Sequence, residues 1–153
     1  MIRFYNYLGS EDLVKSLSHE VRDGWVSKGE YIQKFENEIS KVTGLKYNFS
    51  VSNGTIALHC AFEALNLKQN DEIVFPSLGY MAAANVAILK GYKPLFADVN
   101  LQTGNLDIDS LRKIITKNTK AVVFIHNYGN SSGIFEISEF CISQNLFLVE
   151  DCA

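Results

Sequence analysis

Two short polar segments, each following an apolar one, could together hold a phosphorylated pyridine ring. The segment Ser52 to Thr55 leads from a short apolar run into a helical pattern. The first turn of a helix offers free backbone N–H groups and the positive end of the helix dipole to a phosphate. Gly54 leaves room for that group, and the Thr55 hydroxyl adds a donor. Asp151 follows the apolar run Leu146 to Val149 and could pair with a protonated ring nitrogen. The pattern indicates a pyridoxal phosphate site.

Each segment also has a plain structural interpretation. Ser52 or Asn53 can act as a common helix N-cap, and a strand-end aspartate often caps the following turn. The segment Ser52 to Thr55 matches neither GxGxxG nor GxxxxGK[ST], which argues against a dinucleotide site or a P-loop. A nucleotide-binding α/β domain that uses Gly54 as a phosphate turn stays open as the weaker alternative.

Two further residues follow apolar runs. Tyr80 comes shortly after the run that ends at Pro76 and could stack on a flat ring, although an isolated aromatic residue is more often part of a core. His126 follows the run Ala121 to Ile125 and could be a pocket residue or a hydrogen-bonded structural histidine. The acidic residues show no metal-ligand spacing and the three cysteines no CxxC motif, so we expect neither a metal site nor a disulfide framework.

The elements that must position these residues alternate between helical and strand patterns. The expected helices are 31–42, 55–67, 80–90, 107–115 and 136–144, and the expected strands are 47–51, 73–75, 95–97, 121–125 and 146–149. Short, nearly continuous apolar strands between helices predict an α/β fold with a mainly parallel sheet and helices on both faces. Ligands bind at the carboxyl ends of such strands, where every candidate residue lies.

Composition narrows the class of protein. The chain has 153 residues, 47% of them hydrophobic and 20% charged, with a formal net charge of -3. This is typical of a globular domain and gives no electrostatic footprint for nucleic acid. No apolar run approaches the roughly 18 residues of a membrane span, and no signal peptide is apparent, so we expect a cytoplasmic protein.

The order and spacing of the segments resemble the DegT/StrS family of pyridoxal-phosphate-dependent sugar aminotransferases, which have the aspartate-aminotransferase type of fold. The segments that carry the resemblance are 24–29, 51–59, 71–77 with Tyr80, 96–99, 105–107, 119–122, 126–129 and 149–153. They span nearly the whole chain.

The resemblance implies a role for each matching residue. It places Gly54 and Thr55 at the cofactor phosphate, Tyr80 on the ring, Asp151 at the ring nitrogen, and Trp25 and Ser27 on the substrate side. Family members move an amino group, usually from glutamate, onto a nucleotide-linked keto-sugar and work as homodimers. Gly79 departs from the hydroxyl residue expected before the aromatic.

The resemblance also implies that residues 1–153 are a partial cofactor-binding large domain. In the family, the Schiff-base lysine and the small domain follow the Asp151 motif, and the lysines of this chain lie at other motif positions. Among these lysines, Lys28, in the substrate-side loop, is the one expected near the pocket. We therefore expect the isolated chain to be inactive; a non-catalytic remnant or interaction module of the same fold is the alternative.

Overall fold

The computed structural model describes residues 11–22, 24 and 29–153, which divide into two compact units. The first unit, residues 1–50, is called the N-terminal unit here, and the second, residues 51–153, the α/β unit. None of the helices in the described part of the chain is long and apolar enough to cross a bilayer.

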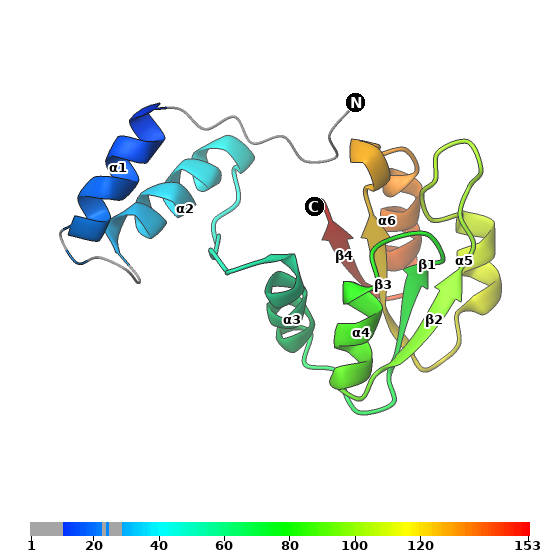
Figure 1. Cartoon of the computed structure of the whole chain (residues 1–153). Helices are drawn as coiled ribbons and strands as arrows, with labels where there is room; N and C mark the ends of the chain where they lie inside the picture. Colours follow the sequence, from blue (N-terminus) through cyan, green and yellow to red (C-terminus); the bar gives the residue numbers. More distant parts are fainter. Residues whose placement is uncertain (1–10, 23, 25–28) are drawn as a thin grey trace. The chain divides into compact units, whose positions relative to one another are not determined.

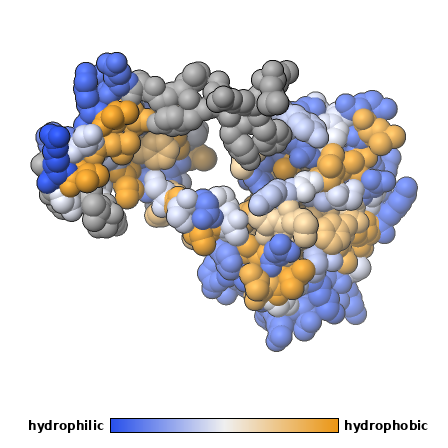
Figure 2. Space-filling view, in the orientation of Figure 1, coloured by the Kyte–Doolittle hydropathy of each residue, from blue (hydrophilic) through white to orange (hydrophobic). Residues whose placement is uncertain are grey.

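The N-terminal unit contains two amphipathic helices, α1 (Glu11–Arg22) and α2 (Glu30–Thr43). The helix predicted over 31–42 is confirmed by α2, which ends at Gly44 in the left-handed conformation with a φ of 72°. Helix α1 was not predicted, although Leu13, Val14, Leu17 and Val21 have the spacing of one helical face. Figure 2 shows hydrophobic residues on the surface of this unit, and the exposed ones on its helices include Leu13, Val14, Leu17, Val21, Tyr31 and Phe35.

The strand predicted over 47–51 is wrong. These residues form irregular chain, and Tyr47 and Phe49 are exposed. A strand exists only when its backbone bonds to a neighbouring strand. The four strands in the described part of the chain pair with one another and with no part of 47–51, so β-branched and aromatic content alone does not create a strand here.

The α/β unit is built on a four-stranded parallel sheet in the order β2-β1-β3-β4 (Figure 1). Its strands are β1 (Glu72–Pro76), β2 (Lys93–Ala97), β3 (Thr119–Ile125) and β4 (Phe147–Asp151). The other predicted strands are therefore confirmed. Central strand β3 has six of its seven residues buried, as expected for a parallel strand covered on both faces.

Helices cover both faces of this sheet, as predicted. Alternate residues of the strands pack with α3 (Gly54–Ala64) and α4 (Ala82–Leu89) on one face, called the α3/α4 face here. The intervening residues pack with α5 (Ile108–Ile114) and α6 (Ile134–Ser143) on the other, the α5/α6 face. A 3-10 turn, η1 (Asn127–Gly129), follows β3. Figure 1 shows the strand tips and the beginnings of α3 and α4 at one edge, called the carboxyl edge here.

Phe75 in β1 is central to the core of the α3/α4 face. It is 2% exposed, and its ring packs edge-on against Phe62 of α3 at 6.2 Å between centroids. We expect Phe75→Ala to lower the free energy of unfolding by about 3–5 kcal/mol, because it leaves a cavity as well as losing burial. Urea unfolding followed by circular dichroism measures this. Phe135→Ala is the matched control, since Phe135 is 85% exposed and its loss should change stability by under about 0.5 kcal/mol. Equal effects of the two substitutions would contradict the packing described.

Candidate functional site

The beginning of α3 offers backbone donors at the carboxyl edge. The Asn53 side chain caps the helix, its Oδ1 accepting from the Ile56 N–H at 3.0 Å, as the plain interpretation of this segment predicts. Within the described part of the chain, the N–H groups of Gly54 and Thr55 have no hydrogen-bond partner. Both residues are exposed, and a Cβ added at Gly54 would meet nothing within 4 Å. Capping thus leaves two free donors and open space, which is what an anion at a helix N-terminus requires.

Tyr80 lies in the turn between β1 and α4, with 82% of its surface exposed. It borders a cavity of about 220 Å³ whose other walls include Phe75, Phe96, Ile125 and Met81. The cavity wall is largely apolar, so a flat apolar ring would lose little hydration energy on packing there.

Gly79 brings this turn close to β3. A Cβ at Gly79 would come within 2.5 Å of the Ile125 Cδ1 atom. The hydroxyl residue expected from the family pattern would therefore require the Ile125 side chain to move. The glycine lets Ile125 occupy that space and keeps this wall of the cavity apolar.

Asp151 ends β4 at the carboxyl edge and is partly buried. Its carbonyl accepts from the His126 N–H at 2.9 Å, and its carboxylate Oδ1 accepts from the Ala153 N–H at 3.1 Å. The second bond is the turn-capping role that the plain interpretation predicts. Side chains alternate along a strand, so Asp151 shares the α3/α4 face with Val149, which packs against the core of that face.

Two asparagines hold the loops of this edge together. The Asn127 Nδ2 donates to the Leu78 carbonyl at 3.3 Å and to the Gly104 carbonyl at 2.8 Å, which ties the Tyr80 turn to two other loops. Asn105 is 1% exposed, and its Nδ2 donates to the carbonyls of Asn130 at 2.8 Å and Ser132 at 3.1 Å. Sequence reasoning missed both roles, because the carbonyl partners of these side chains belong to loops that are distant in the sequence.

The structure places four of the six predicted cofactor- and substrate-binding residues at the same edge of the sheet. Gly54, Thr55, Tyr80 and Asp151 all lie at the carboxyl edge, within the α/β unit (Figure 1). Their roles in cofactor binding stay a prediction. Trp25 and Ser27, predicted on the substrate side, lie outside the described residues.

Comparison with known proteins identifies the family. Residues 9–153 match the DegT/DnrJ/EryC1/StrS aminotransferase family. The chain belongs to this family. GDP-perosamine synthase from Escherichia coli O157:H7, a curated relative, is 41% identical over 130 residues, which are 84% of this chain and 36% of that protein.

Solved structures of similar proteins share the fold of this chain. An aminotransferase from Psychrobacter cryohalolentis superposes with a TM-score of 0.91 at 28% identity, covering 95% of this chain and 38% of that one. The E. coli GDP-4-keto-6-deoxy-D-mannose-3-dehydratase with bound hydrated PLP gives a TM-score of 0.88 at 27% identity, covering 95% and 39%. The chain thus spans somewhat over a third of the length of each of these three proteins.

The cysteines allow a test of electrostatics at the carboxyl edge. Burial raises the pKa of the Cys152 thiol, and the carboxylates of Glu150 and Asp151 raise it further. Burial alone raises the pKa of Cys141 to about 11. A higher pKa means less thiolate at neutral pH and slower alkylation.

We expect Glu150→Gln to lower the Cys152 pKa and speed its alkylation by iodoacetamide at pH 7.5, since one of the two negative charges is removed. Peptide mass spectrometry in the presence of a chelator gives the rate for each cysteine. Glu38→Gln, on exposed α2, is the control and should change nothing. An unchanged Cys152 rate in Glu150→Gln would contradict this description, and so would rapid native-state labelling of buried Cys141.

Proposed function

We propose that residues 1–153 form the N-terminal part of the large domain of a pyridoxal-phosphate-dependent aminotransferase that transfers an amino group, from glutamate, to a nucleotide-linked keto-sugar. The observation that carries the proposal is the presence, at one sheet edge in a chain of this family, of free helix N–H donors and a strand-end carboxylate. The first could hold the phosphate and the second the ring nitrogen of the same cofactor.

The residues present fit pyridoxal phosphate. The N–H groups of Gly54 and Thr55, with the Thr55 hydroxyl, would bind its phosphate, and Tyr80 would contact its ring. The Asp151 carboxylate would hold a proton on the pyridine nitrogen, because a neighbouring negative charge favours the protonated form. When bound, the cofactor supplies an electron sink that stabilises negative charge next to the substrate amine.

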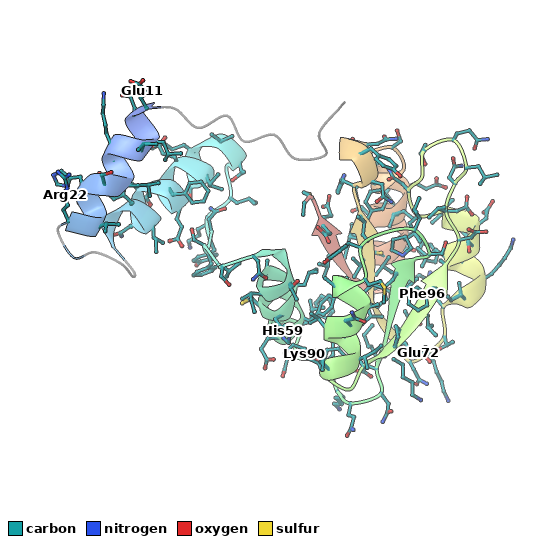
Figure 3. The ribbon with its side chains drawn as sticks, viewed as in Figure 1. Glu11, Arg22, His59, Glu72, Lys90 and Phe96 are labelled. Atoms are coloured by element: carbon teal, nitrogen blue, oxygen red, sulfur yellow. The ribbon has the colours of Figure 1, made fainter. Side chains whose placement is uncertain are left out.

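The positions of the lysines in the α/β unit support the proposal that another part of the whole enzyme supplies the amine for covalent cofactor binding. Lys68, Lys90, Lys93, Lys113, Lys117 and Lys120 all lie where a strand begins or a helix ends, at the amino edge of the sheet. Figure 3 shows Lys90 at the same end of the unit as Glu72, the first residue of β1. The Lys90 ammonium donates to Glu63, whose pKa this hydrogen bond lowers. We infer that the amine which binds the cofactor covalently comes from outside these six residues.

The relatives support the choice of substrate. A GDP-perosamine synthase is 41% identical to this chain, and a GDP-4-keto-6-deoxy-D-mannose-3-dehydratase shares its fold at 27% identity. Both names specify a GDP-linked sugar. Dehydration is therefore the second candidate reaction on the same class of substrate, and the higher identity favours amino transfer.

Two further assignments belong to the proposal. Trp25 and Ser27 would contact the sugar substrate, as the family pattern implies. The enzyme would be a cytoplasmic homo-oligomer, which the exposed apolar residues of α1 and α2 support, since such faces are usually covered by partner surfaces.

Binding of pyridoxamine phosphate to the chain tests the cofactor site, because this form needs no covalent lysine. We expect Asp151→Asn to weaken binding about 10- to 100-fold, as losing a hydrogen bond to a charged group costs about 1.5–3 kcal/mol. Equilibrium dialysis at pH 7.5 measures the dissociation constants. Asp109→Asn, at an exposed position of α5 on the opposite face, is the matched control. Equal affinity in Asp151→Asn and wild type would remove Asp151 from the site.

Covalent capture tests the lysine assignment. After incubation with pyridoxal phosphate and reduction with borohydride, we expect no stoichiometric pyridoxyl group on the six lysines of the α/β unit, because they lie at the amino edge. Tryptic mass spectrometry locates any adduct. The chain by itself should also fail to convert a GDP-linked 4-keto sugar with glutamate. Turnover together with an adduct on one of these lysines would overturn the assignment, and an adduct on Lys28 would point to the N-terminal unit.

A further inference from the structure

A cluster of three possible metal ligands lies at the carboxyl edge on the α5/α6 face, away from Asp151. The His126 Nε2 and the Glu150 Oε2 are 2.9 Å apart. One ligand atom each from His126, Glu150 and Cys152 lies within 4.8 Å of the others. The sequence did not predict this group, since 24 residues separate His126 from Glu150.

The sheet register brings the three side chains together. Phe124 pairs with Glu150 and Ile125 with Asp151, so His126 comes beside Cys152 one step further on. Residues 150 and 152 project to the same face of β4, because side chains alternate, while Asp151 projects to the other. The cluster and the candidate cofactor site therefore occupy opposite faces of one strand end.

The surrounding contacts hold the ligands in place before any ion arrives. The imidazole of His126 has 13% of its surface exposed and packs edge-on against the Phe124 ring at 4.9 Å. The residues on either side of Cys152 are held by two hydrogen bonds: the His126 N–H donates to the Asp151 carbonyl, and the Ala153 N–H donates to the Asp151 side-chain carboxylate. Pre-organised ligands lose little conformational entropy when they bind.

We propose that His126, Glu150 and Cys152 form a binding site for one divalent transition-metal ion of the zinc type. Imidazole, thiolate and carboxylate are the ligands zinc uses, whereas magnesium and calcium prefer oxygen alone. Zinc–ligand bonds of about 2.0–2.3 Å at tetrahedral angles separate ligand atoms by roughly 3.4–3.6 Å. The three atoms need only small side-chain movements to reach that spacing.

The charges balance when the ion binds. The neutral imidazole of His126 carries its single proton on Nδ1, which leaves the Nε2 lone pair for the ion, and the Glu150 carboxylate binds as an anion. The Cys152 thiol loses its proton to solvent, so one carboxylate and one thiolate cancel the two positive charges. Three protein ligands leave the fourth tetrahedral position for water. Because this site lies on the other face from Asp151, it does not depend on the proposed cofactor function.

Cobalt(II) titration of the full chain, after removal of metals with a chelator, tests the site. We expect one ion per chain, with a thiolate-to-cobalt charge-transfer absorption band and displacement of the cobalt by zinc. Cys152→Ser should abolish the band and weaken binding by at least about 100-fold, since losing a direct ligand exceeds the 10- to 100-fold cost of losing an outer partner. Glu150→Gln should weaken binding as well while circular dichroism stays unchanged.

Cys60→Ser is the matched control, because Cys60 is also a free, exposed cysteine but lies on α3. It should keep both the band and the stoichiometry. Absence of stoichiometric binding by the wild-type chain would overturn the proposal. Survival of the band in Cys152→Ser, or its loss in Cys60→Ser, would do the same.

Discussion

Backbone pairing of β3 with both of its neighbours is the constraint on which the carboxyl edge depends. The strand bonds to β1 on one side and to β4 on the other, and the β4 register continues as far as Ile125 opposite Asp151. The His126 N–H adds a further bond to the Asp151 carbonyl. Since β3 is buried on both faces, its backbone has no water to bond with and the ladder must stay paired. A slip of one residue would turn Asp151 to the α5/α6 face.

The same ladder separates two kinds of chemistry by side-chain alternation. On the α3/α4 face it places Asp151 beside Ile125, which lines the apolar cavity next to Tyr80, with the free donors of α3 at the same edge. On the other face it places His126 against Glu150. The lysines of this unit lie at the amino edge, so the carboxyl edge keeps a negative strand end beside positive helix ends. That arrangement suits a ligand with an anionic phosphate and a cationic ring.

Physical reasoning from the sequence succeeds where one local pattern decides the outcome. The run Ala121 to Ile125 is apolar enough to require burial, and Gly44 supplies the left-handed helix end. It fails at 47–51, because a strand forms only when it pairs with another strand, and none of the four strands in the described residues pairs with this segment. Tyr80 and Asp151 were predictable at the carboxyl edge because each lies at the end of a predicted strand that the structure confirms. Gly54 and Thr55 follow 47–51, which is not a strand, and they reach this edge as the beginning of α3. Asn127 and the His126–Glu150 pair were not, because their partners are set by loop geometry and sheet register.

At Gly79 the chain departs from the family pattern, and the side chain of Ile125 occupies the space that a larger residue would need. A side chain here would overlap the tip of Ile125, and that residue pairs with Asp151 across the sheet. The tip of an isoleucine can rotate, whereas the backbone of a central strand cannot move without breaking its ladder. Position 79 can therefore hold glycine with the Ile125 side chain as it stands, or a small hydroxyl residue with the Ile125 side chain rotated. The present pair places hydrocarbon where the other would place a hydroxyl, so position 79 adds no polar group to the cavity wall formed by Ile125.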